Sequence, residues 1–294
     1  MGVLLQGNAA LALLAAVLWG GGDFSGGMGV KSAGGSVGAA LRVVLLSHAA
    51  SLVVLFAVAN VRGDSLPHAV PLVASLVAGL SGGAALVCFY IALSRGAMGA
   101  PAAVSGLLAA AIPALVSVVS EGSPGAMRMA GFVLAGGAIW LIAAGPAAGE
   151  GAAEARGTMA LAIAAGTGFG IYFVALKVAG AAGVVWPMAL ARTGSVSLCA
   201  LTLLAMRGRR GAERVRLNRR AVGWSLSTAV LDTSGNLLFI AATRAGRLDV
   251  AAVLASLYPA STILLAAWML RERPTRSQGL GMAVAAVAVV MITA

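Results

Sequence analysis

Long apolar stretches alternate along the chain with short groups of glycine, proline and charged residues. A helix that crosses a hydrocarbon core about 30 Å thick needs about 20 predominantly apolar residues. Ten stretches of this kind occur, at residues 9–28, 36–60, 69–93, 97–119, 127–147, 157–176, 184–206, 221–243, 249–270 and 277–294. The runs are too long and too continuous for the strands of a barrel, so we predict ten membrane-spanning helices.

Landmarks of the first half of the chain recur in the second half. Arg42 recurs as Arg192 and Trp19 as Phe169, and the offsets stay between 149 and 151. Five crossings in each copy make the second copy enter the membrane from the opposite side. The predicted fold is therefore an all-α polytopic membrane protein whose ten transmembrane helices form two inverted five-helix repeats. The expected boundaries are 1–147 for the first repeat, 148–156 for a linker and 157–294 for the second repeat.

Composition agrees with a membrane protein, since 60% of the residues are hydrophobic and 10% are charged. A soluble domain has about a quarter of its residues charged. Forty glycines favour close helix packing, and the codon bias of a GC-rich genome explains the excess about equally well. Cys88 and Cys199 fall inside spans without a second cysteine or a histidine pair nearby, so we expect neither a metal nor a cofactor.

The net charge of +11 lies mainly in short loops between the spans, where basic residues act as topology signals. We therefore expect no nucleic-acid partner. The loop at 207–220 carries seven arginines and is predicted to be cytoplasmic, which would turn both termini outward.

Three short motifs carry a resemblance to a known family. They are Trp19-Gly20 with Phe24, Phe169-Gly170 with Phe173 and Lys177, and Tyr258-Pro259 followed thirteen positions later by Glu272. With these motifs the chain resembles, over essentially its whole length, the EamA-like ten-span branch of the drug/metabolite transporter superfamily. The first half departs from the pattern, because Pro113 is followed by Glu121 after only eight residues.

The resemblance implies a multi-pass protein of the cytoplasmic (inner) membrane that exports a small metabolite, such as an amino acid or a related compound. It also implies cytoplasmic termini, which is the opposite of the orientation given by the loop charges. Both orientations stay open, and so does the oligomeric state.

Four prominent ionisable residues fall inside predicted spans, where a charge costs about 2.5–3.5 kcal/mol on insertion scales. Asp23 and Arg42 lie at matched depth on consecutive helices, and so do Arg192 and Asp232. The two pairs either fix helix packing or supply a cavity carboxylate that takes up a proton or a substrate ammonium group. We favour the second role for Asp23, because it lies one turn after Trp19 on the same helix face.

Further candidates are aromatic, polar or helix-breaking residues within the spans. The expected substrate-binding or coupling residues are Trp19, Asp23, Arg42, Tyr90, Tyr172, Arg192, Asp232, Asn236 and Tyr258. Pro113 and Pro259 are candidate gating residues, since a proline in a span removes a backbone hydrogen bond. His48 is expected to be a packed or hydrogen-bonded helix residue rather than a proton relay. Glu121 and Glu272 are expected to cap helices or form ion pairs at the span exits.

These features favour secondary transport by alternating access around a central cavity, for a small-molecule substrate within a lipid bilayer. No phosphate-binding loop is present, so the energy would come from a gradient, with protons as the candidate coupling ion. The alternative is an intramembrane aspartyl protease that uses Asp23 and Asp232, because Gly20–Asp23 matches Gly-x-Gly-Asp. Glycine is so abundant that this match carries little information, and we do not predict an enzyme.

Overall fold

The computed structural model describes residues 7–95, 98–143, 152–207, 216–271 and 275–293. Within these ranges every regular element is a helix. The elements are α1 (Gly7–Ser32), α2 (Val37–Arg62), α3 (Ala69–Arg95), α4 (Gly99–Glu121), α5 (Ala126–Ala143), α6 (Ala152–Ala179), the short 3-10 helix η1 (Gly180–Ala182), α7 (Val185–Arg207), α8 (Arg219–Ala245), α9 (Leu248–Ala255), α10 (Tyr258–Met269) and α11 (Arg276–Thr293).

Each of the ten predicted spans contains a helix, and the ninth contains two, α9 and α10. By length and apolar composition, seven described stretches are able to cross a membrane: α1, α2, α3, α4, α6, α7 and the segment Leu248–Met269. The α5 and α11 segments are apolar but shorter. Helix α8 is 27 residues long and carries polar residues such as Asp232, Thr233 and Asn236. The chain is therefore a multi-pass helical membrane protein.

Local sequence signals explain where several helices begin and end. Ser36 precedes α2, and its hydroxyl accepts a hydrogen bond from the backbone N–H of Ala39 at 3.2 Å. The same helix ends at Gly63, which has a left-handed φ of 67° that glycine adopts without strain. Asn218 caps α8 by accepting from the Ala221 N–H at 2.8 Å. These caps confine the spans to the apolar stretches.

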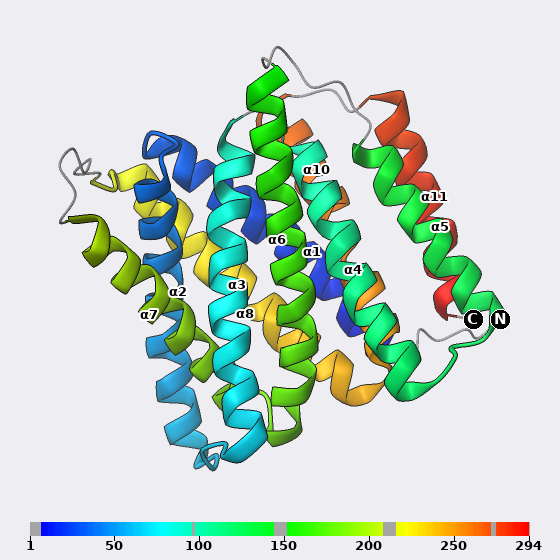
Figure 1. Ribbon diagram of the computed structural model, residues 1–294, viewed down its shortest axis with the longest axis horizontal. Coiled ribbons are helices and arrows are strands. Elements are labelled where there is room, and N and C mark those ends of the chain that lie inside the picture. Colours follow the sequence, from blue (N-terminus) through cyan, green and yellow to red (C-terminus); the bar gives the residue numbers. More distant parts are fainter. Residues whose placement is uncertain (1–6, 96–97, 144–151, 208–215, 272–274, 294) are drawn as a thin grey trace.

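The closest helix pairs join the first half of the chain to the second half (Figure 1). Helix α1 packs on α8 and α10, and α3 packs on α6 and α7. Helix α2 lies against α7, while α5 and α11 pair at one side of the bundle (Figure 1). The core of the bundle therefore lies between the two halves and not within either one.

Glycines allow the halves to approach at backbone distance. A β-carbon at Gly20 in α1 would lie 2.7 Å from the carbonyl oxygen of Tyr258 and 2.9 Å from the backbone nitrogen of Thr262 in α10. A β-carbon at Gly79 in α3 would overlap the carbonyl oxygen of Ala191 in α7. Such contacts matter in lipid, where helix association depends on close packing.

The outer surface of the bundle is apolar. Val61 is 90% exposed, Val119 is 88% exposed and Trp268 is 79% exposed. Large apolar side chains at this exposure are costly in water and are ordinary toward hydrocarbon tails. This surface supports the assignment of the chain to the membrane.

Replacing Gly20 by alanine is expected to destabilise the protein by about 1–3 kcal/mol, because the added methyl group overlaps the α10 backbone. Gly137→Ala is the matched control, since a β-carbon at Gly137 in α5 meets nothing within 4 Å. Thermal unfolding of the purified protein in detergent measures both variants. Equal midpoints for the two variants would contradict the close approach of α1 and α10.

Candidate functional site

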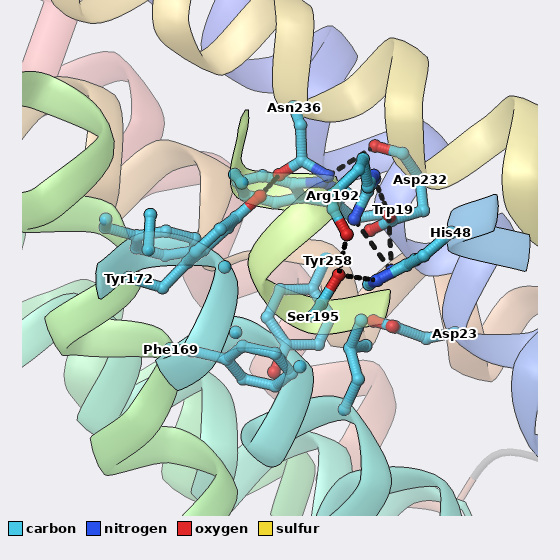
Figure 2. A pocket seen from close by; sticks show the side chains of 17 residues that line it. Trp19, Asp23, His48, Phe169, Tyr172, Arg192, Ser195, Asp232, Asn236 and Tyr258 are labelled. Carbon is cyan, nitrogen blue, oxygen red and sulfur yellow. Dashed lines mark hydrogen bonds and ion pairs between the residues drawn. The ribbon is translucent and has the colours of Figure 1, made fainter. Parts of the chain in front are cut away.

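A cavity lies between the two halves, enclosed by side chains of α1, α2, α3, α6, α7, α8 and α10. Its volume is about 30 Å³. The cavity is therefore narrow. Its polar and aromatic wall is formed by Trp19, Asp23, His48, Phe169, Tyr172, Phe173, Arg192, Ser195, Asp232, Asn236 and Tyr258 (Figure 2).

Arg192 on α7 is the centre of the polar network. One terminal nitrogen of its guanidinium, Nη2, forms an ion pair with Asp232 on α8 and donates to the Thr233 hydroxyl at 3.1 Å. The predicted Arg192–Asp232 pair is thus confirmed. Arg192 is 2% exposed and Asp232 is 7% exposed, so each charge depends on the other for neutralisation.

His48 on α2 completes this network. Nη1 of Arg192 lies 2.7 Å from His48 Nε2, and His48 Nδ1 lies 2.6 Å from the hydroxyl of Ser195. A guanidinium only donates, so Nε2 must accept and the ring proton of a neutral imidazole belongs on Nδ1. The Ser195 hydroxyl in turn donates to the Arg192 carbonyl oxygen at 3.0 Å. Donors and acceptors therefore alternate without conflict around the network.

Asn236 extends the network along α8 toward α6. Its side-chain Nδ2 donates to the Asp232 carbonyl oxygen at 2.7 Å, and its Oδ1 accepts from the Tyr172 hydroxyl at 2.7 Å. These two bonds fix which end of the amide faces each neighbour. Tyr172 is thereby held with its ring along the cavity wall (Figure 2).

Aromatic rings form the rest of the wall. Trp19 stacks on Phe173 with ring centroids 5.0 Å apart and an interplanar angle of 5°. Phe89, behind the wall, meets Phe169 and Tyr258 edge-on at 5.6 and 6.1 Å. The Tyr258 hydroxyl is 2.6 Å from the Ser105 hydroxyl. One part of the cavity is therefore polar and charged, and another part is aromatic.

Asp23 lines the same cavity, is 7% exposed and makes no hydrogen bond or ion pair with any described residue. Figure 2 shows its carboxylate without a dashed contact to the other residues drawn. The expected pairing of Asp23 with Arg42 therefore does not occur. Arg42 is half-buried outside the cavity wall, and its guanidinium donates to the Gly38 carbonyl oxygen of its own helix at 2.8 Å. The two residues share a depth but face different directions.

Three other candidates lie away from the wall. Tyr90 is fully buried behind it, packed against Gly26, and its hydroxyl has no partner among the described residues. Pro113 lies inside α4, which continues through it, while Pro259 follows the break between α9 and α10. Sequence reasoning overlooked His48 as a cavity residue, although it expected a hydrogen-bonded role for it. Ser195 and Phe169 were not among the site predictions. For Ser195, the one sequence feature that indicated a place in the cavity wall is its three-residue spacing from Arg192.

The expected role of Glu121 is confirmed, because it accepts from the Leu248 N–H at the start of α9 at 3.2 Å and pairs with Lys177 at 3.5 Å. Glu272 lies outside the described residues. Among the described residues, no group of three or more histidine, cysteine, aspartate or glutamate side chains is arranged to hold a metal ion.

The apolar bundle with a charged cavity between its helices is the architecture of a multi-pass membrane protein. Residues 156–294 match the EamA-like transporter family, a family of membrane transporters within the drug/metabolite transporter superfamily. A crystal structure superposes with a TM-score of 0.70 over 97% of this chain and 95% of that chain, at 19% identity, which shows a shared fold. A comparison with curated proteins gives no match.

Replacing Asp232 by asparagine is expected to cost about 3–5 kcal/mol of stability, because the buried Arg192 charge loses its counter-ion. The double variant Arg192→Gln with Asp232→Asn removes both charges and should recover most of that loss. Arg42→Gln is the control, since Arg42 pairs with no acidic side chain that the structure describes. Thermal unfolding in detergent provides the measurement, and a double variant no more stable than Asp232→Asn would refute the pairing argument.

Proposed function

We propose that the protein is a secondary-active transporter that exports a small metabolite, an amino acid or a related compound, across the cytoplasmic membrane by alternating access. The observation that carries this proposal is the charged cavity enclosed between the two halves of an apolar bundle. Relative motion of the two halves would change access to such a cavity without exposing its charges to lipid. The direction of transport and the type of cargo rest on the family resemblance.

We also propose the inverted-repeat arrangement, with repeats at 1–147 and 157–294. The reciprocal contacts support it: α1 packs on α8 as α6 packs on α3, and α1 packs on α9 and α10 as α6 packs on α4. Helices α2 and α7 contact each other, as do α5 and α11. Five crossings per repeat would relate the two halves by an axis in the membrane plane.

The interrupted ninth span is the proposed moving element. Helix α9 ends at Ala255, α10 begins at Tyr258, and the buried Ser256 hydroxyl between them has no partner among the described residues. A break in a span leaves backbone groups outside the regular helix ladder, where a small rotation is less costly. Pro259 is therefore the preferred gating residue, and the continuous α4 offers less support for Pro113.

A set of polar contacts, here called the latch, holds the end of α4 to α6 and α9. The Lys177 ammonium pairs with Glu121 at 3.5 Å and donates to the Thr243 carbonyl oxygen at 2.7 Å. Arg247 donates to the carbonyl oxygens of Glu121 and Gly122 at 3.1 and 2.7 Å. The latch joins the two halves at one end of the bundle, so alternating access would require it to open.

Asp23 is the proposed proton-coupling residue, because its carboxylate lines the cavity and has no partner in the described part of the chain. The protease alternative gains no support from the geometry. A catalytic pair of aspartates shares a proton between adjacent carboxyl groups, whereas Asp232 is paired with Arg192 and makes no hydrogen bond with Asp23.

Cysteine labelling tests alternating access without knowledge of the cargo. Ala78→Cys and Ala191→Cys each place a thiol on the cavity wall, in a protein whose Cys88 and Cys199 have been replaced by serine and alanine. An impermeant maleimide should label both thiols from the outer face of the membrane in intact cells. In inverted vesicles, whose cytoplasmic face is turned outward, it should label both thiols from the cytoplasmic face. The reason is that one cavity opens to each side in turn.

Ala288→Cys is the matched control, because Ala288 is equally buried but lies on α11 outside the cavity wall, and it should stay unlabelled. Labelling of the cavity thiols from one side only would refute alternating access. Labelling from both sides together with an ion leak in proteoliposomes would indicate a channel instead.

Glu121→Gln should raise the rate at which Ala191→Cys is labelled from the side that the latch closes. We expect about a two- to fivefold increase, since a partly exposed ion pair contributes about 0.5–1 kcal/mol. Arg62→Gln is the control, because it removes another exposed pair, Arg62–Asp64 at 3.0 Å, outside the latch. Equal labelling rates in the Glu121→Gln variant and the parent protein would exclude the latch from gating.

A further inference from the structure

We infer that the cargo, which enters when relative motion of the two halves widens the cavity, is an organic ammonium compound, a monocation with an aromatic or other flat apolar group, whose charge is received by Asp23. This inference rests on the proposed transport function and narrows its substrate class from small metabolites in general to positively charged ones.

The charges on the cavity wall do not balance when Asp23 is ionised. The groups that face it from neighbouring helices are Asp23 on α1, His48 on α2, Arg192 on α7 and Asp232 on α8. Arg192 and Asp232 neutralise each other, and the hydrogen-bond pattern makes His48 neutral. An ionised Asp23 therefore leaves one net negative charge in the enclosed space, and a cation is required to balance it.

The Asp23 carboxylate has no protein partner among the described residues. A buried carboxylate normally accepts hydrogen bonds or pairs with a cation, yet Asp23 does neither among the described residues. Other protein groups already form hydrogen bonds with the side chains of Asn236, Ser195 and Thr233. The Asp23 carboxylate is therefore a polar group of the wall that is open to a ligand.

The contacts of Arg192 exclude an anionic cargo. Arg192 is the one described cation on the cavity wall, and its Nη1 and Nη2 groups already bind His48, Asp232 and Thr233. Its Nε is buried without a partner, so it does not present a free edge to the cavity. A ligand carboxylate would have to displace Asp232, which costs more than it returns because Asp232 would then be buried without its counter-ion.

The aromatic side chains of the wall suit a ligand with a flat apolar part. Trp19 lies one turn before Asp23 on α1 and stacks on Phe173, while Phe169, Tyr172 and Tyr258 complete an aromatic wall. Aromatic faces attract ammonium groups and accept flat apolar groups alike. A carboxylate beside such faces is the chemistry expected for an aryl or alkyl ammonium ion, and a proton would compete for the same carboxylate.

Calorimetry on the purified full-length chain in detergent tests this inference with four probes of one shape. The probes are 2-phenylethylamine, the neutral 2-phenylethanol, the anionic 3-phenylpropionate and the zwitterion phenylalanine. We expect the amine to bind at least about tenfold more tightly than the alcohol, in line with a charge-assisted contact. The two probes that carry a carboxylate should bind more weakly than the amine.

Asp23→Asn should lower the amine affinity at least about tenfold, to the level of the alcohol, and leave the alcohol affinity unchanged. Asp23→Glu keeps the charge and should keep the preference for the amine. Asp64→Asn removes an acidic side chain outside the cavity and is the matched control. The elution profile of each variant reports folding, which should be intact because the Asp23 side chain makes no hydrogen bond or ion pair with the described residues.

Equal affinity for amine and alcohol, an unchanged amine affinity in Asp23→Asn, tighter binding of phenylalanine than of the amine, or no binding of any probe would each overturn the inference. These results are independent of the labelling experiment. If the cavity thiols are still labelled from both sides, transport stands and only the cationic cargo is lost. If they are labelled from one side only, the transport proposal fails whatever the probes do.

Discussion

The Arg192 guanidinium carries a full positive charge inside an apolar bundle, and the polar cavity is organised around that charge. Asp232 neutralises it, while Thr233 and His48 each accept one further hydrogen bond from it. Because removing any one partner would leave a buried charge or donor unmatched, helices α2, α7 and α8 are held in one arrangement. The network therefore works as a rigid wall, and the unpaired Asp23 across the cavity is left free to meet a ligand or a proton.

The two halves resemble each other in packing but not in electrostatics. Helices α1 and α6 make corresponding contacts with the opposite half. Lys177, which closes the latch with Glu121, corresponds at an offset of 150 to Gly27, which has no charge to offer. Likewise, Arg192 corresponds to Arg42, and only Arg192 has an acidic partner. The two halves therefore place different polar contacts at corresponding positions.

The sequence predicted the helices, because apolar length is set by the bilayer and needs no tertiary information. It also predicted the Arg192–Asp232 pair from depth alone, and the capping role of Glu121 from its place at a span exit. The family motifs located Trp19, Phe169 and Phe173 on helices that line the cavity. These features depend on position along a helix, which residue counting gives at about 1.5 Å per residue.

Rotation of each helix about its own axis was decided only by the tertiary structure. Asp23 and Arg42 match in depth, yet one faces the cavity and the other folds back onto Gly38. Tyr90 packs behind the wall, and His48 lies within it because Arg192 and Ser195 of the other half approach α2. The sequence alone thus determined which residues lie at the level of the cavity. Contacts between the halves determined which of them face it, because a long-range contact fixes the direction that a side chain takes.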